Sequence, residues 1–96
     1  MAEIMYRDAL RQALFEEMEK DPTVFIMGEG IGERGGSYKV TEGLLSKFGP
    51  GRVMDTPLSE PTFTGAGVGA ALAGTRPIVE ILFVDFTTLV MDQLIN

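Results

Sequence analysis

Apolar positions follow two patterns that alternate along the chain. Between residues 6 and 20 they recur every three or four positions among charged side chains, which predicts an amphipathic helix. Residues 23–27 form a short continuous apolar run, typical of a strand that is covered on both faces. By the same reasoning we expect helices at 40–48, from about 61, and at 86–96, and strands at 52–55 and 77–83.

Strands that alternate with helices through short connections predict an α/β fold, a parallel sheet flanked by helices. In such sheets, ligands bind beyond the carboxyl ends of the strands. The loops that leave the predicted strand ends contain Glu29, Glu60, and the pair Asp85 and Phe86. The predicted topology therefore brings these side chains to one edge of the sheet, where we expect the ligand site.

The length of 96 residues suits one small domain and leaves no room for a second. The last predicted helix has an apolar face and no stop signal, so we expect the fold to be incomplete without more chain or another subunit. The chain begins without the pattern of a secretory signal or transit peptide. No apolar stretch approaches the ~20 residues that span a bilayer. We therefore expect a cytoplasmic protein that makes no contact with a membrane.

Charge and composition exclude several function classes. A net charge of −6 and the lack of a basic stripe argue against a nucleic-acid partner. Cysteine and histidine are both absent, which excludes a disulfide framework and a thiolate metal site. We predict no metal ligands in this chain. The chain by itself also cannot use a Ser–His or Cys–His mechanism.

Glycine and alanine dominate residues 65–74, within a predicted helix. Residues 65–70 match the dinucleotide-binding fingerprint, but that fingerprint must directly follow a strand, and residues 60–64 are already predicted as helical. Each glycine inside a helix costs ~1 kcal/mol relative to alanine. We therefore interpret the run as a close-packed surface, with Gly65, Gly69 and Ala73 on one face of the helix.

Glu60 stands between a turn-like stretch and this glycine-rich helix. One interpretation is that it only favours the helix dipole, with Ser59 as the cap and Pro61 suited to the first turn. The other is that its carboxylate is placed for chemistry on a buried cofactor. For the glycine-rich residues 28–36, a flexible surface loop and a loop that borders a ligand are both open, and no Gly-Lys-Ser/Thr motif follows.

Several segments carry a resemblance to a known family. They read GSYKVTEGL at 36–44, KFG at 47–49, RVMDTPLSE at 52–60, GTRPIVE at 74–80, FVDF at 83–86 and DQLIN at 92–96. Together they resemble the β subunit of thiamin-diphosphate-dependent 2-oxo acid dehydrogenases. This is the decarboxylating component of the pyruvate, branched-chain and acetoin dehydrogenase complexes. The chain also contains the family's cofactor signature, here Glu60, Gly65, Ala66 and Gly69.

The resemblance implies a fold and four site residues. It implies the N-terminal part, over residues 1–96, of a transketolase-like pyrimidine-binding domain with the thiamin-diphosphate-binding fold. In the family, the glutamate at the position of Glu60 hydrogen-bonds the aminopyrimidine of the cofactor and so activates it. Phe86 and Leu58 match positions that contact the same ring. Glu29 matches an acidic residue near the cofactor, although Gly30 follows it where the family commonly has aspartate.

The resemblance also implies partners that complete the active site. The diphosphate of thiamin diphosphate and its Mg²⁺ are held by an α subunit with a Gly-Asp-Gly motif that this chain lacks. The implied assembly is a heterotetramer with a second β subunit, docked on the acyltransferase core of the complex. The implied reaction is oxidative decarboxylation of pyruvate or a related 2-oxo acid, or acetoin cleavage. This oxidoreductase fragment is expected to be inactive alone.

A second function class is open on the residues themselves. In this alternative the chain is a non-catalytic α/β association module, which uses the glycine-rich helix for subunit packing and Glu60 only to begin that helix. Transketolase-like enzymes with both halves in one chain fit less well at residues 55–57 and 83–86.

Overall fold

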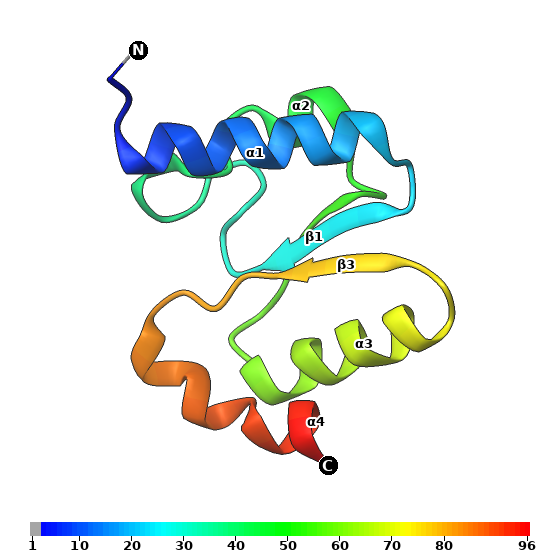
Figure 1. The fold of residues 1–96 in the computed structure, drawn as a ribbon. Helices are drawn as coiled ribbons and strands as arrows, with labels where there is room; N and C mark the ends of the chain where they lie inside the picture. The colour runs from blue at the N-terminus through cyan, green and yellow to red at the C-terminus, as the bar shows by residue number, and fades with distance from the viewer. Residues whose placement is uncertain (1–2) are drawn as a thin grey trace.

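The computed structural model describes residues 3–96 and has the predicted α/β architecture. Its helices and strands are α1 (Tyr6–Lys20), β1 (Val24–Gly28), η1 (Ser37–Lys39), α2 (Leu44–Phe48), β2 (Val53–Asp55), α3 (Glu60–Leu72), β3 (Arg76–Val79), η2 (Val84–Leu89) and α4 (Met91–Ile95). The three strands are parallel and lie in the order β2-β1-β3. Helices α1 and α2 cover one face of the sheet, and α3, η2 and α4 cover the other (Figure 1).

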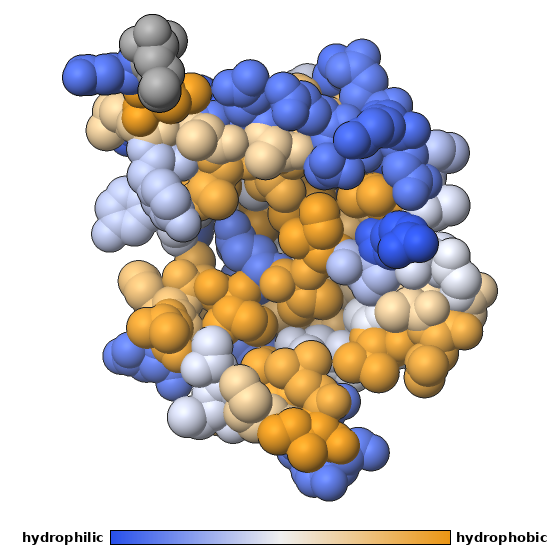
Figure 2. Space-filling view, in the orientation of Figure 1, coloured by the Kyte–Doolittle hydropathy of each residue, from blue (hydrophilic) through white to orange (hydrophobic). Residues whose placement is uncertain are grey.

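The core lies between α1 and the central strand β1. Its buried members are apolar side chains from both helical and strand segments: Met18, Val24, Ile26, Ile31, Leu44 and Val53. The outer surface of α1 is hydrophilic, whereas apolar side chains gather between the two helical layers (Figure 2). The helical spacing of the apolar positions in α1 thus places one face of this helix on the sheet, as the sequence predicts.

Arg52 ties the start of β2 to the end of α1. Its Nη2 donates hydrogen bonds to the carbonyl oxygens of Met18 at 2.6 Å, Asp21 at 2.9 Å and Val24 at 2.8 Å, and its Nε donates to Val24 at 3.0 Å. The guanidinium also lies 4.9 Å from the ring centre of Phe48. Because the carbonyls that end a helix lack partners within it, a forked cation is well suited to this position.

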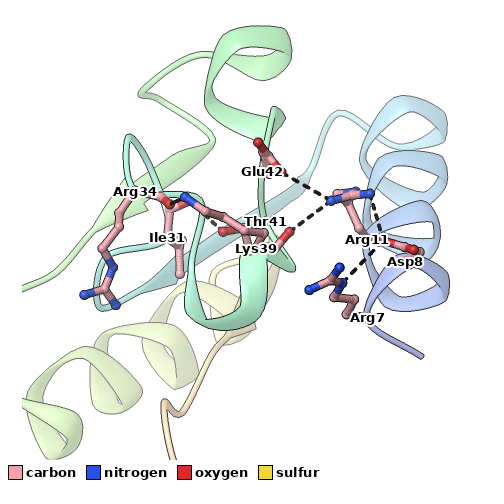
Figure 3. Close-up of polar contacts among 8 residues, drawn as sticks. All are labelled: Arg7, Asp8, Arg11, Ile31, Arg34, Lys39, Thr41 and Glu42. Carbon is pink, nitrogen blue, oxygen red and sulfur yellow. Dashed lines mark hydrogen bonds and ion pairs between the residues drawn. The ribbon is translucent and has the colours of Figure 1, made fainter. Parts of the chain in front are cut away.

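The loop between β1 and α2 is fixed by hydrogen bonds. The amide of Gly36 donates to Gly30, and that of Thr41 to Gly35, at 2.9 and 3.0 Å. The Thr41 hydroxyl donates to the Ile31 carbonyl at 2.7 Å. On the outside, the Arg11 side chain of α1 donates to the Lys39 carbonyl at 3.2 Å, as Figure 3 shows. These hydrogen bonds give residues 30–41 a defined arrangement, and both interpretations of residues 28–36 stay predictions.

Three predicted elements have different bounds in the structure. The helix expected at 40–48 is only Leu44–Phe48, because Gly43 before it has a φ of 86°, outside the helical region. The strand expected at 77–83 is Arg76–Val79. The helix expected at 86–96 is divided at Val90 into a 3₁₀ segment and the five-residue α4. Val90, the residue at which the helix is divided, is buried.

The glycine-rich run lies inside α3, which confirms that it does not follow a strand directly and so is no dinucleotide fingerprint. The close contact of this helix is made by a different glycine from those predicted. A Cβ on Gly67 would lie 2.6 Å from Cγ2 of Val79, and one on Gly65 would lie 3.4 Å from Gln93, whereas one on Gly69 would meet nothing within 4 Å. The tight approach is therefore made by Gly67 to a strand side chain, and Ala73 is exposed.

Candidate functional site

Each of the three strands leads to a glutamate at its carboxyl end. Glu29 directly follows β1, Glu60 begins α3 five residues after β2, and Glu80 directly follows β3. Because the strands are parallel, these ends meet at one edge of the sheet. The Glu29 and Glu60 side chains are almost completely buried, at 5% and 8% exposure. Glu29 and Glu60 thus lie at the predicted edge. Asp85 and Phe86, which were also expected there, are exposed residues of η2.

The Glu29 carboxyl is the most deeply buried acidic group of the site. Neither of its oxygens has a hydrogen-bond partner among the described residues. Burial raises the pKa of Glu29 above its ordinary value, the adjoining Glu60 carboxyl raises it further, and the charge of Glu80 adds to the effect. Two carboxylates this close repel each other unless one of them holds a proton. Glu29 is therefore the carboxyl of this pair that burial and the neighbouring acids make easier to protonate.

Glu60 occupies the first position of α3, with Pro61 next to it. The predicted capping role of Ser59 is wrong, because its hydroxyl makes no capping hydrogen bond and instead donates to the Pro57 carbonyl at 3.3 Å. A carboxylate at a helix start gains from the helix dipole even in full contact with water. The burial of Glu60 against a second acid is therefore not explained by helix formation.

Further buried polar atoms without partners lie after β2 and β3 and on helices α3 and α4. Among the described residues they are the hydroxyls of Thr56 and Thr64, Oε2 of Glu80 and Oε1 of Gln93. Buried polar groups in proteins are nearly always hydrogen-bonded, so this concentration indicates a surface built to contact a polar ligand. Carboxylates accept hydrogen bonds and repel anions. The buried carboxyls of Glu29 and Glu60 therefore favour a ligand group that donates hydrogen bonds over an anionic one.

Leu58 and Phe86, the two apolar residues predicted at the cofactor, lie on the surface. Leu58 is 82% exposed in the turn before α3, and Phe86 is 37% exposed in η2. The rings of Phe86 and Phe83 make an edge-to-face contact with centres 5.8 Å apart. The structure thus brings Glu29 and Glu60 together and leaves Leu58 and Phe86 available for contact with another molecule.

Glu80 was missed by the sequence analysis, which placed it within a strand. Burial raises the pKa of Glu80, and the positive charge of Arg34 opposes this rise. The signal was present: a single charged residue interrupts the apolar run from Ile78 to Phe83. An acidic side chain within a buried run requires either a partner or a function.

Replacement of Glu29 with glutamine is expected to stabilise the cofactor-free protein at high pH. The folded pKa of Glu29 lies above the ordinary 4.5, so the folded state keeps this proton where the unfolded chain has lost it. The stabilisation is therefore complete below pH 4.5 and is lost as pH rises through the raised pKa. Thermal unfolding should give the variant a Tm advantage over the unmodified subunit at pH 8 that shrinks at pH 4. Glu33→Gln, on the exposed loop, is the control, and an advantage that is equal at both pH values contradicts the assignment.

Two further observations concern residues 3–96. No group of three or more histidine, cysteine, aspartate or glutamate residues in this range is arranged to hold a metal ion. Nor does any of the helices there combine the length and apolar character needed to cross a membrane.

Comparisons with known proteins identify the family. The model of the family described as "Transketolase, pyrimidine binding domain" matches residues 2–96. The chain is 53% identical, over 98% of its length, to pyruvate dehydrogenase E1 component subunit beta-1 of Arabidopsis thaliana, a mitochondrial protein, and to the E1 subunit beta of Rickettsia bellii. It is 52% identical to the E1 subunit beta of Rhizobium meliloti. The chain spans only 26%, 29% and 21% of these three relatives. The chain belongs to the transketolase pyrimidine-binding domain family.

Proposed function

We propose that this chain supplies the proton-handling side of a thiamin diphosphate site in the decarboxylating component of a 2-oxo acid dehydrogenase. Residues 1–96 would form the N-terminal part of the pyrimidine-binding domain of a β-type subunit. The observation that carries the proposal is the burial of Glu60 beside Glu29 at the carboxyl ends of the strands. The relatives, which are named as beta subunits of the pyruvate dehydrogenase E1 component, agree with it.

Glu60 is the catalytic residue of this proposal. When bound, thiamin diphosphate supplies the electron sink for decarboxylation of the 2-oxo acid. The Glu60 carboxyl would share one proton with a ring nitrogen of the aminopyrimidine, so that either the carboxyl or the ring N–H is the hydrogen-bond donor. Its burial strengthens this hydrogen bond, because a charge-assisted bond gains from a low local dielectric.

The other site residues orient the ring and control charge. Leu58 and Phe86 are exposed apolar side chains that would contact the faces of a flat aromatic ring. Burial and the neighbouring Glu60 raise the pKa of Glu29, and in its protonated form Glu29 adds no negative charge beside Glu60 and can donate one hydrogen bond. The acid–base work therefore falls to Glu60.

A partner would hold the remainder of the cofactor. The acidic edge repels a diphosphate, so the diphosphate and Mg²⁺ are assigned to an α subunit, as in the family that the sequence resembles. The heterotetramer with a second β subunit and its docking on an acyltransferase core are proposed from the same family resemblance. The substrate would be pyruvate or a related 2-oxo acid, or acetoin. The relatives named above are a mitochondrial protein and two bacterial proteins, so the cytoplasmic location stays a prediction.

Isothermal titration tests the division of the site between two chains. The polypeptide of residues 1–96, titrated with thiamin diphosphate and Mg²⁺, is expected to show weak binding or none, and no turnover. The assembled α and β subunits under the same conditions should bind the cofactor. Tight binding by residues 1–96 alone would contradict the two-subunit site.

The association module remains the second candidate function, and one observation favours it. The outward face of α3 exposes Gly69 and Ala73, and Leu72 beside them is 85% exposed. Small residues let another backbone approach closely, and exposed leucine favours burial in an interface. In this candidate, Glu60 has no role in catalysis.

A further inference from the structure

A side chain of strand β2 joins the two segments that carry the buried carboxyls. The amide of Gly32 donates a hydrogen bond to Oδ1 of Asp55 at 2.8 Å. Gly32 lies in the loop after β1, three residues beyond Glu29, and Asp55 ends β2, five residues before Glu60. The bond spans 23 positions of the sequence and therefore connects the loop of one carboxyl to the segment that leads to the other.

The contact with Asp55 explains why residue 32 is a glycine. Gly32 is not among the glycines of this chain that have a positive φ, so the backbone conformation does not require glycine there. A Cβ on Gly32 would, however, lie 2.6 Å from Oδ2 of Asp55. The close approach of the carboxyl group excludes a side chain at this position, and Gly32 and Asp55 are thus a matched pair.

The burial of the two residues suits this hydrogen bond. Gly32 is buried, and a buried backbone N–H is nearly always hydrogen-bonded. Asp55 is exposed, so its carboxylate accepts the bond without the cost of a buried charge. Asp55 makes no ion pair within 4 Å among the described residues, so a neighbouring cation does not account for its place.

Two other contacts hold the chain around Glu29. The amide of Thr56 donates to the carbonyl of Gly28 at 2.9 Å, which keeps the end of β2 against β1. Ile31 is completely buried in the core. The bond to Asp55 adds a third contact, on the side of the connection between β2 and α3. It is the one of these three contacts that depends on a polar side chain, and a substitution can therefore remove it.

We propose that Asp55 is a positioning residue of this site, which holds the loop that carries Glu29 beside the segment that leads to Glu60 and so keeps the two carboxyls adjacent. The inference rests on the proposed function, because it assigns a role within the same site. Asp55 needs no contact with cofactor or substrate for this role. What it supplies is an acceptor oxygen, which asparagine retains and alanine lacks.

The pH dependence of stability tests the positioning in the full-length β-type subunit. With Asp55 present, Glu29→Gln is expected to raise the Tm more at pH 8 than at pH 4, because Glu29 is buried beside other acids. In an Asp55→Ala background this pH-dependent gain should fall by roughly half or more, since a displaced Glu29 carboxyl is better hydrated. In an Asp55→Asn background the gain should persist.

Two results of this experiment would overturn the proposal. Asp55→Ala could lower the Tm by the same amount at both pH values and leave the gain from Glu29→Gln intact, in which case the bond only stabilises the fold. Asp55→Asn could abolish the gain as completely as Asp55→Ala does, in which case the charge of Asp55 matters and its acceptor oxygen does not.

Turnover of the assembled α and β subunits gives a second readout. Asp55→Ala is expected to lower kcat about 10- to 100-fold, because a small displacement of groups at the reacting centre is costly. Asp55→Asn should recover most of this loss. Glu33→Ala, an exposed position in the same loop, is the matched control and should keep the kcat of the unmodified enzyme. Equal kcat values for Asp55→Ala and Glu33→Ala would overturn the proposal.

Gly32→Ala tests the same contact from the loop side, because its Cβ would displace the Asp55 carboxyl. It should give the losses expected of Asp55→Ala, and it takes the place of that variant if Asp55→Ala does not fold. If neither variant folds, the bond is needed for folding itself and the positioning role is overturned. The Tm readout requires neither cofactor nor turnover, so its failure leaves the proposed function intact, whereas full turnover of Glu60→Gln would contradict that function.

Discussion

Glu60→Gln in the assembled enzyme is expected to lower turnover about 10²- to 10⁴-fold, the usual contribution of a positioned acid–base group. Glutamine has nearly the same shape, and Glu60 makes no ion pair within 4 Å among the described residues, so the fold should tolerate the exchange. What is lost is the ability to exchange a proton with the cofactor ring. Steady-state rates with saturating thiamin diphosphate and Mg²⁺, together with the sedimentation of the complex, measure both effects.

Glu33→Gln serves as the matched control, because Glu33 is an exposed glutamate in the loop after β1. Its turnover should equal that of the unmodified enzyme. If Glu60→Gln also kept full turnover with normal assembly, the catalytic assignment would be refuted and the association module would remain. If it prevented assembly, Glu60 would be structural, again contrary to the proposal.

Arg52→Ala is expected to reduce the free energy of unfolding by about 2–4 kcal/mol. The substitution leaves the carbonyls of Met18 and Val24 without the Arg52 donor, whereas the Asp21 carbonyl keeps the Val24 amide at 3.2 Å; each unsatisfied buried group costs about 1–3 kcal/mol. These carbonyls are only partly buried, so water can replace some of the lost hydrogen bonds and the total cost is smaller than full burial would give. Urea denaturation of the full subunit measures the change: the urea concentration at the unfolding midpoint should fall while the m value stays the same.

Two other variants separate this explanation from a general effect of charge. Arg76→Ala removes a side chain that is 78% exposed and pairs with Asp21 only at 4.0 Å, so its cost should stay below about 0.5 kcal/mol. Arg52→Lys should fall between, because lysine lacks the planar fork that reaches several carbonyls at once. Equal losses for Arg52→Ala and Arg76→Ala would refute the network explanation.

Periodicity succeeded for the elements whose pattern depends on nearby residues. The helix over residues 6–20 agrees with the structure in both bounds, and the strand predicted at 23–27 lies within one residue of β1. It failed at residues 86–96, where an apolar pattern at helical spacing is divided at the buried Val90. The spacing shows which side chains are apolar. The division of the helix at Val90 also depends on how η2 and α4 pack against α3.

The glycine-rich helix illustrates the same limit within one element. Composition alone shows that a helix with so many glycines requires a close contact in return. It does not show which glycine makes that contact, since this depends on the angle between α3 and β3. The structure assigns it to Gly67 and Val79.

The amino-acid sequence by itself determined the α/β class, the parallel sheet, and the arrival of Glu29 and Glu60 at one edge, because strand alternation and handed crossovers are local rules. Only the tertiary structure decided that the two carboxyls adjoin in a buried site, that Glu80 joins them, and that Leu58 stays exposed. Burial and the distance between charges depend on how whole elements pack, and these quantities raise the pKa of Glu29.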